Sequence, residues 1–309
     1  MHTILGAGGP VANALTKELL QSGQNVRLVS RRKISSFPEA TWVAADLLNK
    51  QQVLEATKGS TVIYMCAGLR YDSKVWQVEW PVIMNNIIDA AKAANARLIF
   101  FDNVYMYGRV EGAMTESSRF NPSSVKGSVR AKVAEQLLAE MKAGNISASI
   151  ARAPDFYGAE SMNSFLDGMV LDKFSKKAKA MWVGNASTKH SFIYIPDAGK
   201  AVALLGANPD TDNQTWHLPT APALTGLEIM NMAAGIFGTK SAFTRINKLM
   251  LKAIGLFDKK VGEIPELYYQ YQYDYIFDST KFEKRFQFKP TSYADGIRTL
   301  STTMFKGKD

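Results

Sequence analysis

Small residues at the start of the chain have the spacing needed to hold a phosphate group. The strand-like run His2–Leu5 leads directly into the glycine-rich turn 6–12, Gly-Ala-Gly-Gly-Pro-Val-Ala. Gly6 permits a tight exit from the strand, and Gly9 lets the backbone approach a pyrophosphate. Pro10 suits the first turn of a helix whose N–H groups would face phosphate oxygens. This pattern predicts a dinucleotide site at Gly6, Gly8, Gly9, Pro10 and Val11; the alternative is an ordinary strand-to-helix turn.

A pair of arginines indicates which dinucleotide would bind. The second apolar run, Asn25–Ser30, ends where a dinucleotide fingerprint expects an acidic residue on the ribose, but Arg31, Arg32 and Lys33 follow it. Guanidinium groups bind a 2′-phosphate bidentately, whereas a carboxylate would repel it. We therefore predict that Arg31 and Arg32 favour NADP (NADPH) over NAD; a solvated basic loop is the alternative.

Two further sets of residues follow predicted strands. Asp46 and Leu47 come after the third strand, where a carboxylate can accept the adenine amino group, although Asp46 could instead cap the next helix. Cys66, Ala67 and Gly68 end the fourth strand, where small residues let the backbone lie against the ribose and pyrophosphate. All five are predicted to bind the cofactor.

The elements that position these residues alternate along the first half of the chain. Strand-like runs at 3–5, 25–30, 41–45, 61–66, 97–101 and 147–152 are separated by helical patterns such as 51–56, 81–94 and 132–142. This alternation predicts an α/β fold with a Rossmann-type doubly wound parallel sheet and a smaller mixed α/β C-terminal substrate lobe. We expect residues 1–158 to form the NADP-binding Rossmann domain, with 190–220 returning to it. Residues 159–189 and 221–309 then form the substrate-binding lobe.

The composition of the chain limits the classes of molecule that it is expected to bind. The net charge is +9 over 309 residues, but the lysines are scattered and no regular series of aromatic residues accompanies them. This argues against nucleic acid and favours a small anionic cofactor and a small-molecule substrate. A single cysteine and three histidines provide no disulfide framework and no obvious metal site. With no signal-like or membrane-spanning run, we expect a cytoplasmic protein without a membrane partner, as a monomer or homodimer.

Several motifs together resemble the extended short-chain dehydrogenase/reductase superfamily, of the NAD-dependent epimerase/dehydratase type. The resemblance covers nearly the whole chain and rests on Gly6-x-x-Gly9-x-x-Ala12, Asp46-Leu47, Cys66-Ala67-Gly68, Tyr107-Gly108, the run 152–158 and the run 190–198. It implies hydride transfer between a nicotinamide cofactor and a carbonyl or alcohol carbon. It also implies cofactor contacts by Asn103, Lys132, Ala153 and Pro154.

The chain departs from this family at the catalytic residues. In the family a tyrosine four residues before a lysine exchanges the proton, and an upstream serine or threonine positions the substrate oxygen. No tyrosine here has a lysine four positions later; the serine position falls on Asn103, and the nearest lysine is Lys132, four residues after Ser128. The segments 103–108 and 126–132 resemble the atypical members of the superfamily, so the catalytic set is predicted from Asn103, Tyr105, Tyr107, Ser128 and Lys132.

Three interpretations of this altered site stay open. Tyr105 or Tyr107 supplies the phenol, with Arg130 or Lys132 lowering its pKa and Asn103 holding the substrate oxygen. Alternatively, Asp155 or His190 carries the acid–base chemistry. In the third interpretation the protein binds NADP without turnover, as a redox sensor or interaction protein; a sugar-nucleotide epimerase or dehydratase is a further alternative. Both tyrosines could instead be core aromatics, and His190 a surface histidine.

Aromatic and polar residues near the predicted strand ends are candidates for the substrate pocket. We expect the substrate to contact Tyr71, Trp76, Asp155, Tyr157 and His190. Aromatic walls suit an apolar or ring-shaped substrate. The alternative for the aromatic residues is packing between the lobes.

Overall fold

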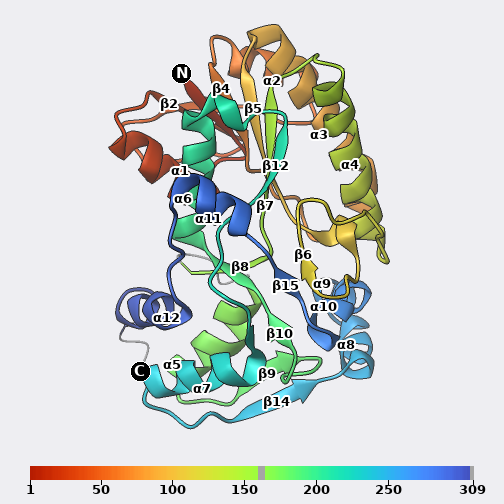
Figure 1. The fold of residues 1–309 in the computed structure, drawn as a ribbon, viewed down its shortest axis with the longest axis vertical. Coiled ribbons are helices and arrows are strands. Elements are labelled where there is room, and N and C mark those ends of the chain that lie inside the picture. The colour runs from red at the N-terminus through yellow and green to blue at the C-terminus, as the bar shows by residue number, and fades with distance from the viewer. Residues whose placement is uncertain (159–163, 307–309) are drawn as a thin grey trace. The chain divides into compact units, whose positions relative to one another are not determined.

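The structure is a computed structural model that describes residues 1–158 and 164–306. The chain divides into two compact units (Figure 1). Unit 1 comprises residues 1–106, 125–153 and 198–218, and unit 2 comprises 107–124, 154–197 and 219–309. Residues 107–124, 154–158 and 190–197 therefore belong to unit 2, although the sequence assigned them to the Rossmann domain. Residues 159–163 of the expected substrate lobe lie outside the described residues.

Unit 1 is built on a parallel sheet. In the described part of the chain its order is β12-β7-β5-β4-β1-β2-β3, and every neighbouring pair is parallel. The bounds are β1 (His2–Leu5), β2 (Val26–Ser30), β3 (Thr41–Ala44), β4 (Val62–Met65), β5 (Arg97–Asp102), β7 (Ala148–Arg152) and β12 (Gln214–His217). The order reverses between β1 and β4, which is where doubly wound sheets bind ligands at the carboxyl ends of their strands.

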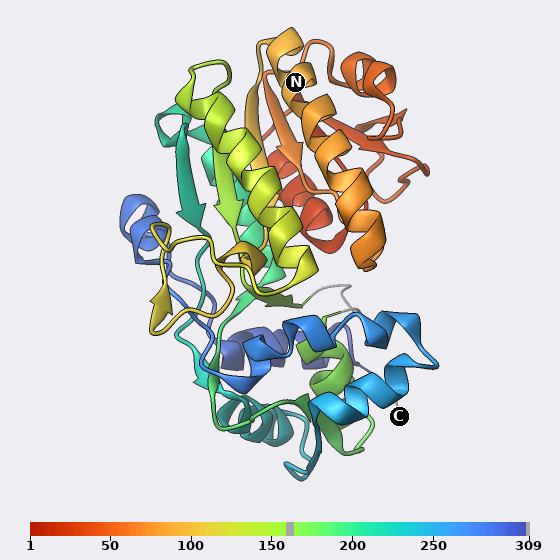
Figure 2. The same cartoon turned by 90° about the vertical axis from the view of Figure 1, so that its right-hand side faces the viewer.

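Helices cover both faces of this sheet. They are α1 (Pro10–Gln21), α2 (Lys50–Thr57), α3 (Ser73–Ala94), α4 (Val125–Lys142) and α6 (Ile195–Ala207). Figure 1 shows α3 and α4 on one face with α1 and α6 on the other, and Figure 2 shows α3 and α4 side by side in front of the sheet. Apolar side chains of α2, α3 and α4 pack on the strands in one buried cluster. The predicted Rossmann-type doubly wound α/β fold is confirmed.

Two of the predicted helices begin earlier than expected. The helix expected from Pro81 begins at Ser73, because the Asp72 side chain accepts hydrogen bonds from the N–H groups of Lys74 and Val75. The helix expected from Lys132 begins at Val125. The first turn of α3 therefore lies close in sequence to the residues that follow β4.

Unit 2 is a mixed α/β unit built on short strand pairs. β8 (Asp155–Tyr157) pairs with β11 (Phe192–Tyr194), β9 (Ala180–Val183) with β14 (Phe243–Ile246), β6 (Ala113–Met114) with β15 (Ile276–Phe277), and β10 (Lys189–His190) with β13 (Leu224–Thr225). Its helices are α5 (Asp172–Ser175), α7 (Gly226–Ile236), α8 (Lys248–Gly255), α9 (Lys259–Gly262), α10 (Tyr269–Gln272), α11 (Thr280–Phe286) and α12 (Tyr293–Thr302). A core of aromatic and aliphatic residues includes Phe174, Trp182 and Tyr293. Across the described residues, no helix is long and apolar enough to cross a membrane.

Candidate functional site

A cleft of about 840 Å³ opens in unit 1 at the carboxyl ends of β1, β2, β3 and β4. Ten of the predicted cofactor residues line it: Gly6, Gly8, Gly9, Arg31, Arg32, Asp46, Leu47, Cys66, Ala67 and Gly68. Pro10 and Val11 do not line it but begin α1 directly beyond the turn. Ala153 and Pro154, whose role came from the resemblance alone, are buried elsewhere. The volume lies within the range of small-molecule sites in proteins.

The glycine turn is shaped for a close approach. Gly6 has φ +80°, and a Cβ on it would lie 2.3 Å from the Ala67 Cα; Gly8 has φ +95°. The N–H groups of Gly6 and Ala7 both donate to the Val29 carbonyl, at 3.0 and 3.1 Å, which fixes the turn on β2. Gly9 is the N-cap of α1 and carries no side chain that could cap its first N–H groups. Backbone donors and the positive end of the helix dipole together suit a phosphate.

Arg31 and Arg32 line the cleft with exposed side chains directly after β2. The Ser30 hydroxyl donates to the Arg32 carbonyl at 2.6 Å and accepts from Trp42 Nε1 at 3.0 Å. These two bonds fix the backbone of the arginine turn. Two exposed cations are therefore held at the mouth of the cleft by an ordered backbone.

Asp46 does not cap α2. Its Oδ1 accepts from the Leu48 N–H at 3.0 Å, while α2 is capped by Asn49, whose side chain accepts from the Gln52 N–H at 3.1 Å. The capping alternative is therefore wrong, because Asn49 stands one turn closer to the helix. The Leu47 carbonyl is held by the Asn86 side chain at 2.9 Å. Cys66, in the same cleft, is partly exposed as a residue, but burial of its thiol raises the pKa to about 12.

Asn103 and Tyr105 lie directly after β5. The Asn103 side-chain oxygen accepts from the Tyr105 N–H at 3.0 Å, and the Asn103 N–H donates to Asp102 Oδ1 at 2.8 Å. The partly exposed Tyr105 ring stacks on the buried Trp76 with 6.3 Å between centroids. Tyr107, by contrast, is fully buried in unit 2 against Phe120, which matches the core-packing alternative.

The predicted pair on α4 lies on the exposed side of that helix. Ser128 and Lys132 are exposed, whereas Lys126 is 0% and Arg130 2% exposed. Arg130 donates through Nε and Nη2 to Asp102 Oδ1, and its guanidinium lies 4.3 Å from the Trp80 ring centroid. The Lys126 ammonium lies 4.4 Å from the ring centroid of Tyr71.

Lys126 and Arg130 were missed as a pair by the sequence analysis. They are four residues apart, which is the separation of the family's tyrosine and lysine, and they share one side of α4 with Val133 and Leu137. Residues at this spacing lie on one face of a helix. The positions of the apolar residues along α4 were the sequence signal. They distinguish the buried face, which carries Lys126 and Arg130, from the exposed face, which carries Ser128 and Lys132.

Asp155 and His190 meet in unit 2. Asp155 Oδ2 lies 3.1 Å from His190 Nε2 and accepts a hydrogen bond from the Tyr271 hydroxyl. His190 is 2% exposed, so the surface-histidine alternative is wrong. Its Nδ1 lies 3.2 Å from the Gln270 carbonyl oxygen, and its ring is stacked 4.7 Å from Tyr271. Both ring nitrogens thus lie within hydrogen-bond distance of a protein oxygen.

Tyr157 lies apart from this cluster. It is 1% exposed in the core of unit 2, and burial raises its pKa well above that of a free phenol. The structure therefore brings Asp155 and His190 together but places Tyr157 in the packing of the unit. Tyr271, which completes the cluster, carried no sequence signal beyond the alternation of aromatic residues around it.

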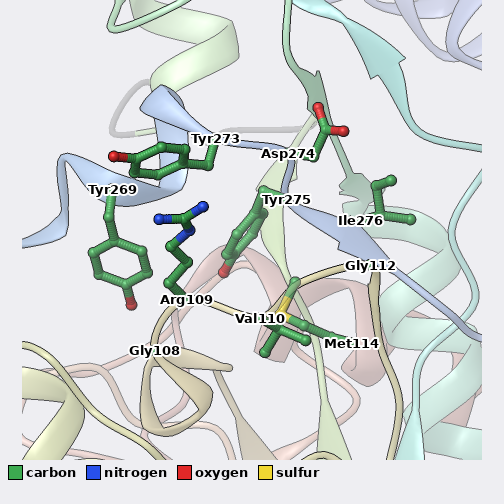
Figure 3. Close-up of a pocket in the computed structure, with 10 residues that line it drawn as sticks. All are labelled: Gly108, Arg109, Val110, Gly112, Met114, Tyr269, Tyr273, Asp274, Tyr275 and Ile276. Atoms are coloured by element: carbon green, nitrogen blue, oxygen red, sulfur yellow. The ribbon is translucent and has the colours of Figure 1, made fainter.

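A second, much smaller pocket lies in unit 2 (Figure 3). Its volume of about 10 Å³ holds no more than a water molecule. The Arg109 guanidinium reaches among three tyrosines there and lies 3.7 Å from the Tyr273 ring centroid. We assign no ligand to it. Among the described residues, no group of His, Cys, Asp and Glu side chains is arranged to hold a metal ion.

The chain is similar to known proteins in both sequence and fold. The chain is 25% identical over 259 residues to dTDP-6-deoxy-L-talose 4-dehydrogenase (NAD(P)(+)) of Kitasatospora kifunensis, a match that covers 79% of this chain and 81% of that protein. The solved structure of UDP-glucuronic acid 4-epimerase from Bacillus cereus in complex with NAD is 17% identical, with a TM-score of 0.79 and coverage of 99% of this chain and 100% of that one. UDP-N-acetylglucosamine 4-epimerase from Bacillus cereus is 14% identical, with a TM-score of 0.80 and coverage of 100% and 97%.

The two structural matches show that the fold is shared. The family model of the NAD dependent epimerase/dehydratase family matches residues 2–218, which include all of the sheet of unit 1. The resemblance predicted from the glycine turn and the later motifs is thereby confirmed. The chain belongs to the NAD dependent epimerase/dehydratase family.

Proposed function

We propose that this protein is an NADP-dependent oxidoreductase of the epimerase/dehydratase type, which transfers a hydride to or from a carbonyl or alcohol carbon of a small molecule. The observation that carries the proposal is the cleft of unit 1, where the glycine turn and two arginines line one cavity. Family membership supports a nicotinamide dinucleotide as the cofactor. When bound, this cofactor supplies or accepts the hydride.

The residues of the cleft fit such a cofactor. The close approach of Gly6 to Ala67 leaves no room for a side chain, which suits a backbone that lies against a pyrophosphate. Asp46 would accept from the adenine amino group, and Cys66, Ala67 and Gly68 would lie against the ribose and pyrophosphate. Gly8 and Gly9 would bring the N-terminus of α1 to the phosphates.

The preference for NADP rests on Arg31 and Arg32. Both follow β2, the strand after which a dinucleotide fingerprint places the ribose-binding acid. Because the hydrogen bonds of Ser30 fix the backbone of this turn, less backbone freedom is lost when the arginines bind a 2′-phosphate.

The substrate contact that we propose in unit 2 is Asp155, with the buried His190 positioned beside it. The Asp155 side chain is 19% exposed, so a ligand can reach it, and its Oδ2 is held by the Tyr271 hydroxyl and lies 3.1 Å from His190 Nε2. A carboxylate accepts hydrogen bonds from hydroxyl groups. Relatives named for sugar-nucleotide substrates also support a hydroxylated, sugar-derived substrate.

Binding measurements with matched charge reversals test the cofactor assignment. Arg31→Asp is expected to raise the Kd of NADPH about 100-fold or more and that of NADH less than about threefold, because a charge-assisted phosphate contact contributes about 1.5–3 kcal/mol and the reversal adds repulsion. Lys33→Asp is the control. It reverses the charge in the same way at the residue next to the arginines, but Lys33 does not line the cleft. Equal losses for NADPH and NADH would contradict the assignment.

Turnover is tested separately. Purified protein with NADPH and a panel of aldehydes, ketones and sugar nucleotides should lose nicotinamide absorbance with at least one compound. Tight NADPH binding with no oxidation across the panel would instead favour the cofactor-sensing alternative, in which binding of NADP is reported to a partner.

A further inference from the structure

Tyr71 occupies a fixed position in the loop that follows β4. It lies in the loop between β4 and α3, two residues after Leu69, which lines the cleft. Its ring meets the buried Trp76 edge-on at 5.8 Å between centroids, and Trp76 Nε1 donates to the carbonyl of Arg70 at 3.0 Å. Asp72, the next residue, caps α3. The partly exposed Tyr71 is thus held from both sides by ordered neighbours.

The buried side of α4 places a cation against this phenol. Lys126 is 0% exposed, and its Nζ lies 4.4 Å from the Tyr71 ring centroid. One turn further along α4, Arg130 is paired with the carboxylate of Asp102, so its charge is compensated there. Of these two buried cations, Lys126 is the one whose ammonium lies over the Tyr71 ring.

The charge of Lys126 also acts on Asp72, the residue next to Tyr71. The pKa of Asp72 is lowered, first by the hydrogen bond from the Val75 N–H and in smaller part by the charges of Arg70 and Lys126. An ammonium within about 4–6 Å of a phenol favours the phenolate. In the family that this chain resembles, a lysine has that effect on a tyrosine of the same helix.

We propose that Tyr71 and Lys126 form the phenol–ammonium pair of the reaction, assembled in space from two elements instead of four residues apart on one helix. Tyr71 is the catalytic acid and base, and Lys126 is a positioning residue that stabilises its phenolate. This assignment rests on the proposed function, because it needs a reduced nicotinamide dinucleotide as the hydride donor.

In the proposed reaction the Tyr71 hydroxyl supplies the proton. In the reducing direction the hydride forms a C–H bond at the carbonyl carbon, and the carbonyl π electrons move to the oxygen. That oxygen takes the proton of the Tyr71 hydroxyl, so one O–H bond breaks and one forms. The resulting Tyr71 phenolate lies beside the Lys126 ammonium until water returns a proton. Oxidation of an alcohol runs the same steps in reverse.

Tyr105 is the competing phenol at the same edge of the sheet. Its ring stacks on Trp76, which also contacts Tyr71, so both tyrosines lie near the carboxyl ends of β4 and β5. The structure places the Lys126 ammonium over Tyr71. Single hydroxyl deletions separate the two, because phenylalanine keeps the ring packing of each.

The first experiment measures NADPH-dependent reduction of 9,10-phenanthrenequinone, a general dicarbonyl probe. Tyr71→Phe should lower kcat by on the order of 10²–10⁴-fold and change the Kd of NADPH less than about threefold. The matched control is Tyr273→Phe, since Tyr273 also lies under a cation, Arg109 at 3.7 Å (Figure 3). It should leave kcat unchanged. A loss with Tyr105→Phe and none with Tyr71→Phe would overturn the assignment.

Lys126→Met tests the cation. It should lower kcat and move the pH dependence of kcat to higher pH, whereas Lys142→Met, an exposed lysine of the same helix, should do neither. If Lys132→Met had these effects and Lys126→Met did not, the cation of the reaction would be Lys132 on the exposed face of α4, and the proposal would be overturned.

A second experiment needs no turnover. With ¹³Cζ-labelled tyrosine, the Tyr71 resonance is identified by its absence in Tyr71→Phe, and its titration is followed by NMR. Lys126→Met should move the Tyr71 titration midpoint to higher pH; an unchanged midpoint would overturn the pairing. If the wild-type protein binds NADPH but reduces no carbonyl compound, the proposed function fails, and this titration still decides whether Lys126 acts on the Tyr71 phenol.

Discussion

Replacing Asp102 tests whether the buried ion cluster at the end of β5 stabilises unit 1. Asp102 is 1% exposed at the end of β5 and lies among Arg130 and Arg152, which are 2% and 1% exposed. Its Oδ1 accepts from Arg130 Nε at 2.9 Å and from the Asn103 N–H at 2.8 Å, and its Oδ2 lies 3.7 Å from Arg152 Nε. One carboxylate thus serves two buried guanidinium groups and one backbone donor.

These contacts determine how far Asp102→Ala should lower the free energy of unfolding. Removing one partner of a buried ion pair costs about 3–5 kcal/mol because the other charge stays buried. The Asn103 N–H loses its acceptor as well, at about 1–3 kcal/mol. Allowing for partial relaxation, we expect the free energy of unfolding to fall by about 4–6 kcal/mol, a large part of the total for a typical domain.

Urea denaturation monitored by circular dichroism measures this cost. The matched control is Asp295→Ala, which breaks a surface pair of similar length, 2.9 Å to Arg298, with side chains 65% and 63% exposed. That change should cost far less, because water already solvates both charges. The double variant Asp102→Leu/Arg130→Met should recover part of the loss, because it removes a buried cation together with the carboxylate. An Asp102→Ala variant within about 1 kcal/mol of Asp295→Ala would refute the reasoning.

Gly6, Asp167 and Cys66 can each be tested on their own. Gly6→Ala should cost about 1–3 kcal/mol of stability from its φ of +80° alone and also weaken NADPH binding. Gly9→Ala, where an added Cβ would meet no atom within 4 Å, should lower the Tm much less in a thermal shift assay, by no more than the change at the N-cap of α1. Burial raises the pKa of Asp167 from 3.8 to about 7, so the folded state binds this proton more tightly than the unfolded chain does. The stability that this proton contributes, roughly 4 kcal/mol, should be lost as the pH rises from about 4 to about 7. Asp167→Asn should flatten that part of the stability–pH curve, and an unchanged curve would count against it. With a thiol pKa of about 12, Cys66 should be roughly 10³-fold less thiolate at pH 8 than a free cysteine, so alkylation by iodoacetamide at the rate of a free thiol would contradict its burial.

The sheet and the cofactor cleft were predictable because their signals are local. The positive φ of Gly6 and Gly8 and the apolar strands on either side of the turn depend on residues within a few positions of one another. Parallel strands then place Arg31, Asp46 and Ala67 at one edge without further information, since the carboxyl ends of neighbouring strands meet there.

The cluster of unit 2 could be predicted only in part. Asp155 and His190 were singled out by their motifs, but Tyr271, which donates to Asp155 and stacks on His190, comes from a distant helical turn. An alternating aromatic segment is equally typical of a strand or a packing surface. Tertiary packing determines that Tyr271 is the tyrosine that reaches the Asp155 carboxylate, and the sequence pattern does not reveal this packing.

The helix α4 shows why a missing motif is weak evidence of a missing reaction. Ser128 and Lys132 satisfy the spacing that the family pattern requires, yet both are exposed, because the apolar residues of the helix turn Lys126 and Arg130 inward. What the chemistry requires is a cation within a few ångströms of a phenol, and sequence spacing is only one way to achieve it. Tyr71 and Lys126 satisfy the distance from two separate elements. The absence of a tyrosine four residues before a lysine therefore does not argue that proton transfer has been lost.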